Sequence, residues 1–368
     1  MTPAYRADHV GSLLRPAALV EARAAYAAGR LTQEQLREVE DRAILDALAL
    51  QREIGLDVFT DGEFRRFSFQ SDMSDAVEGF VPDTEGREWH TPSGVERSVG
   101  GFARVVGGKL RQTRRLTAHE VAFLQAHAPG PFKLTLPSPS LFAGPATYRP
   151  ALVGAVYPTR ADLLRDLVAI IGGEMRALAA EGVPYIQLDA PSYTYFVDPR
   201  EQERARTQGI DLDALLDQFI AADNACLAAA RREGVTLAIH FCRGNSRSRW
   251  LHSGGYEPIA EKVFTTLQVD RFLLEYDSER AGGFEPLRFV PRGKIVVLGL
   301  ITTKEGRLES QEALRRRIEE AARYVPLEQL ALSPQCGFAS SVPGNRLTHD
   351  EQRRKLELVV ETARKVWG

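Results

Sequence analysis

The sequence has few cysteines and no long apolar run. Three cysteines in 368 residues cannot form a disulfide framework, so each thiol needs its own explanation. No stretch approaches the roughly 18 to 20 apolar residues that span a bilayer. Near the start, Arg6, Asp8 and His9 stand where a signal peptide would be apolar. We therefore expect a cytoplasmic protein.

An excess of charge of one sign is also absent. The chain has 47 basic and 49 acidic residues, a formal net charge of −2 with neutral histidines. This balance argues against nucleic acid or an anionic membrane as a partner. Hydrophobic residues at 44% and charged residues at 26% are typical of a soluble globular protein, which argues against disorder. We expect small-molecule substrates.

Short apolar or β-branched runs alternate with stretches whose apolar residues are three and four apart. The predicted strands are 8–12, 57–60, 132–136, 185–189, 235–241, 272–276, 294–301 and 329–332. The predicted helices are 31–54, 117–127, 160–181, 212–233, 259–267, 310–324 and 348–367. About eight strand and helix units favour an α/β TIM (β/α)8 barrel. An open doubly wound sheet is less favoured because no glycine fingerprint follows the first strand.

The segment Phe64–Arg115 interrupts this alternation. It is rich in Gly, Asp, Glu and Arg, and it is far longer than the usual βα loop of about 2 to 6 residues. We expect one barrel over residues 1–368, with residues 64–115 inserted after the second strand at the barrel mouth. The insertion would serve as a lid or as an oligomer contact.

Four potential metal ligands follow the predicted strands. His240 and Cys242 are two residues apart at a strand end, so both point to one face. Glu275 ends another apolar run, and Cys336 begins the loop after the last strand. The carboxyl ends of barrel strands carry the functional groups, so these side chains should converge. One imidazole, two thiolates and one carboxylate form a tetrahedral zinc set.

The net charge of this set favours thiol chemistry. Two thiolates and a carboxylate around Zn²⁺ leave a charge of −1, which polarises a carbonyl poorly. A thiol bound there would lose its proton at neutral pH and remain nucleophilic. Glu275 is the weakest ligand for this metal and is expected to leave when a substrate sulfur arrives. The third cysteine, Cys226, shares a helix face with Leu215 and Phe219 and is expected in the core.

Several spaced motifs point to one known family. They are Ala-Asp-His-Val-Gly-Ser-Leu-Leu-Arg-Pro at 7–16, Thr-Asp-Gly-Glu-Phe-Arg-Arg at 60–66, Ile-Gln-Leu-Asp-Ala-Pro at 186–191, His-Phe-Cys-Arg-Gly-Asn at 240–245, Glu275, and Ser-Pro-Gln-Cys-Gly-Phe at 333–338. With these motifs the chain resembles the catalytic C-terminal domain of cobalamin-independent methionine synthase, and more closely its single-barrel relatives. The resemblance runs over nearly the whole chain.

The resemblance implies methyl transfer to the thiol of homocysteine, which gives methionine. It implies a catalytic zinc held by His240, Cys242, Glu275 and Cys336. The expected methyl donor is 5-methyltetrahydrofolate or its polyglutamate, and the protein is a possible homo-oligomer.

The resemblance also implies how homocysteine is held. Gly11 and Ser12 would bind its carboxylate, and Glu63 and Asp189 its ammonium. Two carboxylates in one mouth repel each other unless a cation lies between them, and an ammonium is such a cation. Alternatively, the two carboxylates form structural salt bridges with Arg65, Arg66 or Arg243.

The chain departs from the family in three respects. It has one barrel where the full-length family enzyme has two. The stretch Val296–Thr303 lacks the family's histidine, proposed as proton donor to the pterin. The family's Asp-Glu-Pro is Asp189-Ala190-Pro191 here. A tertiary amine leaves poorly unless protonated, so the lost acids bear on which donor is used.

Other functions remain open from the sequence. The donor could be a corrinoid protein or a small methyl donor. The acceptor could be coenzyme M, although its sulfonate would suit Glu63 and Asp189 poorly. A decarboxylase resembling uroporphyrinogen decarboxylase shares the fold but needs no metal, and a non-catalytic zinc-binding barrel would have a closed site.

Overall fold

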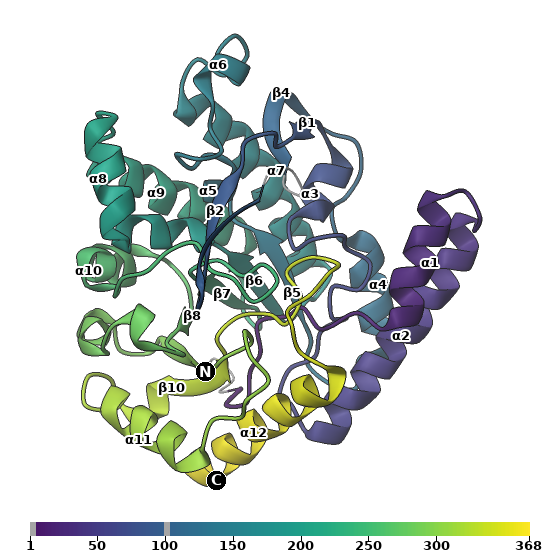
Figure 1. The fold of residues 1–368 in the computed structure, drawn as a ribbon, viewed down its shortest axis with the longest axis vertical. Helices are drawn as coiled ribbons and strands as arrows, with labels where there is room; N and C mark the ends of the chain where they lie inside the picture. Colours follow the sequence, from purple (N-terminus) through teal and green to yellow (C-terminus); the bar gives the residue numbers. More distant parts are fainter. Residues whose placement is uncertain (1–4, 99–103) are drawn as a thin grey trace.

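Six parallel strands form the central sheet of the computed structural model (Figure 1). The structure describes residues 5–98 and 104–368, so residues 99–103 of the predicted insertion lie outside it. The strand order is β5 (Lys133–Pro137), β6 (Tyr185–Asp189), β7 (Thr236–Phe241), β8 (Arg271–Glu275), β9 (Ile295–Ile301) and β10 (Leu330–Pro334). All six were expected within one or two residues of these bounds.

Two extended segments close this sheet into a ring. Ala7 makes a parallel bridge to Leu332 of β10, and Phe59 makes one to Phe132, just before β5. The two segments also meet each other, because the Asp57 amide donates to the Ala7 carbonyl at 3.2 Å. The fold is therefore a TIM barrel, as predicted, whose first two positions are short bridges in extended chain.

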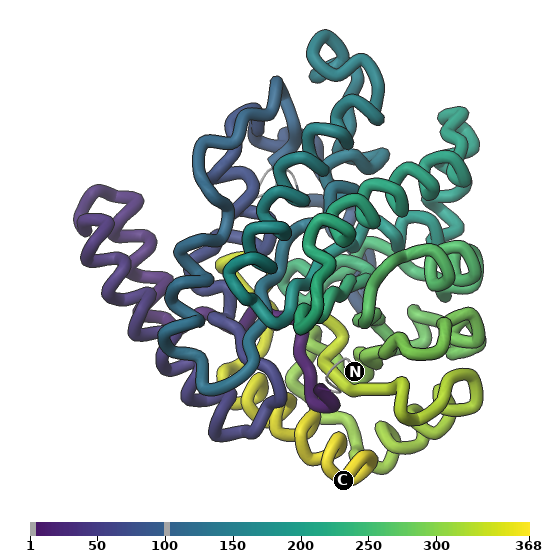
Figure 2. Tube along the Cα trace, turned by 180° about the vertical axis from the view of Figure 1, so that it is seen from behind, coloured from purple at the N-terminus to yellow at the C-terminus, as the bar shows by residue number. Residues whose placement is uncertain are grey.

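Helices surround the barrel on its outside (Figure 2). The longer ones are α1 (Ala17–Ala27), α2 (Gln33–Ile54), α4 (Ala118–His127), α7 (Arg160–Ala180), α9 (Leu212–Ala230), α10 (Glu257–Thr266), α11 (Gln311–Ala321) and α12 (His349–Trp367). The shorter ones are α3 (Ser71–Ala76), α5 (Pro139–Phe142), α6 (Pro150–Val153), α8 (Pro199–Thr207) and the 3₁₀ turns η1 (Pro191–Val197), η2 (Glu279–Ala281), η3 (Glu285–Phe289) and η4 (Leu327–Gln329). Thr32, Thr159 and Thr348 begin α2, α7 and α12 with capping boxes, which satisfy free amides at those ends.

Each barrel strand alternates between two buried layers. In β7, Leu237 and Ile239 belong to the large core between strands and helices, whereas Ala238 belongs to a smaller core inside the barrel. The period of two continues along the strand, so His240 and Cys242 point inward like Ala238. Cys226 of α9 is fully buried in the large core, and the prediction of a core thiol is confirmed.

The segment predicted as an irregular insertion contains two antiparallel pairs. β1 (Val77–Pro82) pairs with β4 (Arg104–Gln112), and β2 (Arg87–Thr91) forms a hairpin with β3 (Gly94–Ser98). The hairpin reaches the loop after β7, where the His90 amide donates to the Trp250 carbonyl at 2.7 Å and the Trp250 amide donates back at 3.1 Å. Figure 1 shows β2 crossing in front of the sheet towards β8.

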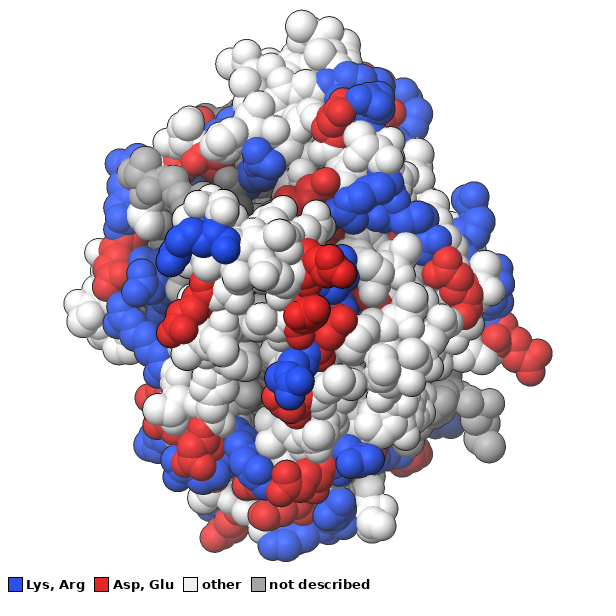
Figure 3. Space-filling model, turned by 90° about the vertical axis from the view of Figure 1, so that its right-hand side faces the viewer, with Lys and Arg blue, Asp and Glu red and all other residues white. Residues whose placement is uncertain are grey.

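On the face shown in Figure 3, basic and acidic side chains are interspersed. Within the described residues, no helix combines the length and the apolar character that a bilayer crossing needs.

Candidate metal centre and substrate site

Three of the predicted metal ligands meet at the barrel mouth. One ligand atom from each of His240, Cys242 and Cys336 lies within 4.8 Å of the other two, and all three residues are buried. β7 supplies the first two from its inward face, and the loop after β10 supplies the third. Residues nearly a hundred positions apart in the sequence thus meet at one end of the barrel, where the strands end.

The chemistry of this group fits a zinc ion. The Nδ1 atom of His240 lies 3.2 Å from the Leu273 carbonyl, which can only accept, so Nδ1 carries the proton. The Nε2 atom is buried and faces the Cys336 sulfur, with no oxygen or nitrogen partner among the described residues. A hydrogen bond from Cys242 holds the pKa of Cys336 well below its usual range, and raises that of Cys242. A lone pair on nitrogen beside two sulfurs suits zinc.

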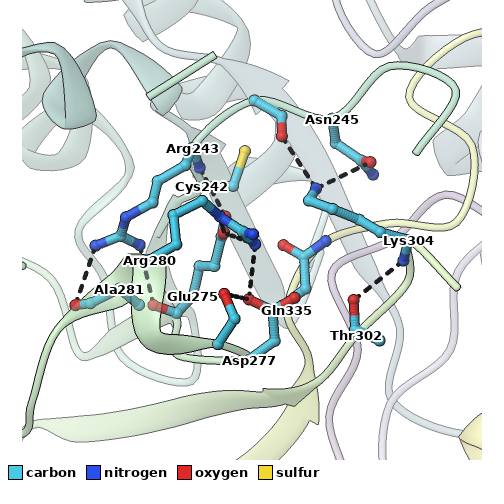
Figure 4. A network of polar contacts seen from close by, with 12 residues as sticks. Cys242, Arg243, Asn245, Glu275, Asp277, Arg280, Ala281, Thr302, Lys304 and Gln335 are labelled. Carbon is cyan, nitrogen blue, oxygen red and sulfur yellow. Dashed lines mark hydrogen bonds and ion pairs between the residues drawn. The ribbon is translucent and has the colours of Figure 1, made fainter. Parts of the chain in front are cut away.

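Glu275 lies beside this group but is engaged elsewhere (Figure 4). Its carboxylate accepts from the Arg243 amide at 2.7 Å and from the Arg280 guanidinium at 2.9 Å. Burial alone would raise its pKa, but three cations, Lys304, Arg243 and Arg280, lower it to about 2. The structure thus gathers three of the four predicted ligands. The fourth, Glu275, is an ionised carboxylate that is hydrogen-bonded to Arg243 and Arg280.

Two buried carboxylates, Glu63 and Asp189, face the same mouth and form no salt bridge within the described residues. Asp189 accepts from the Gln187 amide at 2.7 Å, and Glu63 accepts from the Thr135 hydroxyl at 3.1 Å. The second oxygen of Glu63 is buried and has no hydrogen-bond partner in the described chain. Burial raises the pKa of Asp189 to about 7 and also raises that of Glu63. Each carboxylate would be stabilised by a cation placed between them.

The nearby arginines pair with other carboxylates. Arg66 contacts Asp72 at 2.5 Å and Glu120 at 2.6 Å, and Arg65 pairs with Asp41. The Arg243 side chain donates to backbone carbonyls, including that of Gly254 at 2.6 Å. Within residues 5–98 and 104–368, Glu63 and Asp189 therefore have no salt bridge of the kind weighed as the alternative.

A second group of potential ligands is already neutralised. Atoms of Asp72, His119 and Glu120 also lie within 4.8 Å of one another. The guanidinium of Arg66 contacts both carboxylates of this group and donates to Thr135 as well. This arrangement is a buried ion-pair network, in which arginine already supplies the positive charge.

The Gly11–Ser12 turn packs between Glu63 and the loop that follows Cys336. A Cβ atom at Gly11 would lie 3.0 Å from the Glu63 carboxylate, and one at Gly337 would lie 2.0 Å from the Ser12 hydroxyl. The Ser12 carbonyl also accepts from the Phe338 amide at 2.9 Å. The turn predicted to hold a substrate carboxylate therefore contacts both the Glu63 loop and the loop that carries Cys336.

Two site residues were missed from the sequence. The Lys304 ammonium lies 3.1 Å from the Gly244 carbonyl and 3.3 Å from the Asn245 side-chain oxygen (Figure 4). Asn245 in turn donates to the Gly337 carbonyl at 2.8 Å, which links the loops that follow Cys242 and Cys336. Lys304 comes just after the predicted strand 294–301, and this position could have indicated a residue at the barrel mouth.

Comparison with known proteins agrees with this geometry. Residues 6–365 match the family model described as "Cobalamin-independent synthase, Catalytic domain". The Bacillus subtilis (strain 168) protein YxjH, described as uncharacterized, is 42% identical over 99% of this chain and 95% of its own. A Listeria monocytogenes structure assigned to the vitamin-B12-independent methionine synthases is 29% identical, covers 100% of this chain and 99% of its own, and has a TM-score of 0.76.

A second solved structure shares the fold. It is a B12-independent methionine synthase from Shewanella sp. W3-18-1 in complex with selenomethionine, 21% identical, with a TM-score of 0.73 over 98% of this chain and 97% of its own. The family model, the relatives and the barrel agree along nearly the whole sequence. The chain belongs to the cobalamin-independent methionine synthase family, in its catalytic-domain form.

Proposed function

We propose that the protein is a zinc-dependent methyltransferase that transfers a methyl group to the thiol of homocysteine and forms methionine. The observation that carries this proposal is the juxtaposition of two groups. A buried set of one imidazole and two thiols lies beside two buried carboxylates that form no salt bridge among the described residues. Homocysteine carries a thiol for the first group and an ammonium for the second.

The metal would be held by His240, Cys242 and Cys336, with Glu275 as the fourth ligand. A zinc ion there supplies Lewis acidity that lowers the pKa of the substrate thiol. The Arg280 guanidinium and the Arg243 amide hold the Glu275 carboxylate when it is not a ligand. When Glu275 leaves the metal, its carboxylate is therefore not left as an unpaired buried charge. This arrangement suits a metal ligand that a substrate sulfur replaces.

The chain's own groups orient the amino acid. Asp189 and Glu63 would bind the ammonium, and the Gly11–Ser12 turn would bind the carboxylate. Asp189 is fixed by Gln187, whose amide also donates to the Val10 carbonyl at 2.9 Å. A held amino acid places its sulfur for attack on a methyl group in line, and such positioning is a large part of catalysis.

We propose 5-methyltetrahydrofolate or its polyglutamate as the methyl donor. The family supports this choice of donor. The selenomethionine in the Shewanella neighbour is an analogue of methionine, which supports homocysteine as the acceptor. A corrinoid protein is the second candidate donor. Coenzyme M is a poorer acceptor than homocysteine, because its sulfonate would face the two carboxylates and it has no ammonium to pair with them.

Methionine formation tests the proposal directly. The zinc-loaded protein is incubated with homocysteine and 5-methyltetrahydrofolate, its triglutamate, or methylcobalamin, and methionine is measured by mass spectrometry. We expect methionine with one of these donors and none after chelation of the metal. Alkylation of coenzyme M in place of homocysteine under the same conditions would contradict the proposed acceptor.

A further inference from the structure

Lys304 presents an uncommitted N–H group beside the metal centre. An ammonium has three N–H donors. Two of them are directed at the Gly244 carbonyl and the Asn245 side chain, both neutral acceptors (Figure 4). In the part of the chain that the structure describes, the third has no acceptor, and Lys304 forms no ion pair within 4.0 Å. The nearby carboxylates of Glu275 and Asp277 pair with Arg280 instead.

Lys304 and the proposed amino acid pocket lie on opposite sides of the barrel mouth. Glu63 follows the second barrel position and Asp189 ends β6, the fourth. Lys304 follows β9, the seventh, across the ring. The three clustered ligands come from the fifth and eighth positions, between these two sides. A substrate sulfur at the centre would thus have the amino acid on one side and Lys304 on the other.

In-line displacement places the leaving atom beyond the methyl carbon, away from the sulfur and its amino acid. We propose that Lys304 contacts the methyl donor there and donates its third N–H to the atom that leaves, so that this residue selects neutral donors. The inference rests on the proposed function. It assigns to this chain a donor-binding catalytic residue in a stretch where the sequence offered no acid.

The step balances without a further reagent. A lone pair of the homocysteine thiolate forms the S–C bond, and the electron pair of the broken bond stays on the leaving atom. The Lys304 ammonium donates its third N–H to that atom as the bond breaks. A basic leaving nitrogen takes this proton, and the proton that the thiol released restores the ammonium through water. The thiol released one proton on binding, so no net proton is consumed. A sulfonium or quaternary ammonium donor leaves as a neutral group and would be repelled by Lys304.

Two probe donors compare a neutral donor that leaves as an anion with a cationic donor that leaves as a neutral group. Methyl 4-nitrobenzenesulfonate is neutral and leaves as an anion, whereas trimethylsulfonium is cationic and leaves as neutral dimethyl sulfide. The rate constant for methylation of homocysteine by each is measured on the zinc-loaded full chain, after subtraction of the uncatalysed rate. The readout is the ratio of the two rate constants, which a general loss of active protein does not change.

Lys304→Met should lower the ratio of the neutral to the cationic donor by about tenfold or more, because a fixed charge is removed next to the leaving atom. Lys304→Arg should keep the ratio near that of the wild type. Lys294→Met is the matched control. Its ammonium also lies against two backbone carbonyls, of Phe264 and Leu267, but at the opposite end of β9. This control should leave the ratio unchanged.

The outcomes distinguish the two proposals. An unchanged ratio in Lys304→Met, with zinc still bound, overturns the role of Lys304 and leaves the proposed function standing. Failure of the zinc-loaded wild type to methylate homocysteine with these probes and with 5-methyltetrahydrofolate, its triglutamate and methylcobalamin overturns the proposed function, and the inference with it. Lys304→Gln keeps a hydrogen-bond donor without the charge, and it replaces Lys304→Met in the same comparison if that variant does not fold.

Discussion

Asp189 of β6 and His240 of β7 are register partners in neighbouring parallel strands, and the amide of the next residue, Ala190, donates to the His240 carbonyl at 2.9 Å. Neighbouring strands lie about 4.8 Å apart. The Asp189 carboxylate, proposed to bind an ammonium, and the His240 imidazole, proposed to bind a metal, therefore start from backbone positions one strand spacing apart. The spacing between Asp189 and His240 is therefore set by the sheet and does not depend on a loop.

Loss of either clustered thiol should remove the metal without unfolding the barrel. Cys242→Ala and Cys336→Ala each delete a sulfur from the three-residue group at the mouth, outside the large core. We expect bound zinc to weaken by more than about 100-fold and methyl transfer to fall with it, since even indirect partners of a metal contribute 10- to 100-fold. Zinc content and circular dichroism of each variant measure the two effects.

Cys226→Ala is the control for these variants. Its thiol is fully buried among apolar side chains of α9 and the large core. Its loss should cost about 1 kcal/mol of stability through lost packing, with zinc unchanged. If Cys226→Ala lost zinc, or if a Cys242 or Cys336 variant stayed fully active without metal, the assignment of the metal centre would be wrong.

Asp189→Asn should weaken homocysteine binding while zinc stays bound. The carboxylate is buried, forms no salt bridge within the described residues, and is proposed to bind the substrate ammonium. We expect KM for homocysteine to rise about 10- to 100-fold, in line with the loss of one charged hydrogen bond. The matched probe is 4-mercaptobutanoate, which lacks the amino group and should be used equally by both proteins. An unchanged KM for homocysteine would show that Asp189 is structural.

The stability of the fold should depend on the ionisation of Asp223. This residue of α9 is buried and accepts from Ser138 at 2.6 Å and Tyr193 at 2.8 Å. Burial raises its pKa to about 7, against about 3.9 in an unfolded chain. Because the folded state holds the proton more tightly, this contribution to stability is fully present below about pH 4 and is lost as the pH rises through 7.

Asp223→Asn cannot titrate and removes this dependence. Between pH 5 and pH 8, the free energy of unfolding of the wild type should fall by about 3 kcal/mol relative to the variant. Urea denaturation of both proteins at each pH gives the difference. A difference that stays constant over this range would mean that Asp223 is already ionised at pH 5.

The glycine after Cys336 should tolerate no side chain. A Cβ atom at Gly337 would lie 2.0 Å from the Ser12 hydroxyl, so the loop or the turn has to move. We expect Gly337→Ala to cost about 1 to 3 kcal/mol of stability and to release zinc more readily. Gly173→Ala in α7 is the control, because a Cβ there meets no atom within 4 Å and alanine favours a helix. Equal effects of the two substitutions would contradict the packing argument.

The barrel and the clustered thiols were accessible to prediction because both depend on periodic features. Buried parallel strands are continuous apolar runs, and the spacing of His240 and Cys242 puts both on one strand face. Helix α1 was missed because its sequence, Ala-Ala-Leu-Val-Glu-Ala-Arg-Ala-Ala-Tyr-Ala, has apolar residues on every side. The hairpin of β2 and β3 was missed because β3 is exposed on both faces, which leaves no alternation to detect.

The contacts made by loop side chains could not be predicted. Nothing in the sequence indicates that Arg280 reaches back five residues to Glu275, or that Lys304 reaches Gly244 sixty residues earlier. These contacts depend on where loops from different strands end, and such ends are set by tertiary packing. Arg280, which holds the Glu275 carboxylate, and Lys304, which is proposed to contact the methyl donor, are therefore recognised only in the folded chain.

Zinc K-edge X-ray absorption, with and without homocysteine, tests the central claim most directly. The account predicts zinc with about two sulfur ligands in the free protein and about three when homocysteine is added, as one oxygen ligand is lost. That result would identify homocysteine as the acceptor and Glu275 as the ligand that leaves. A zinc shell that homocysteine does not change would contradict the account.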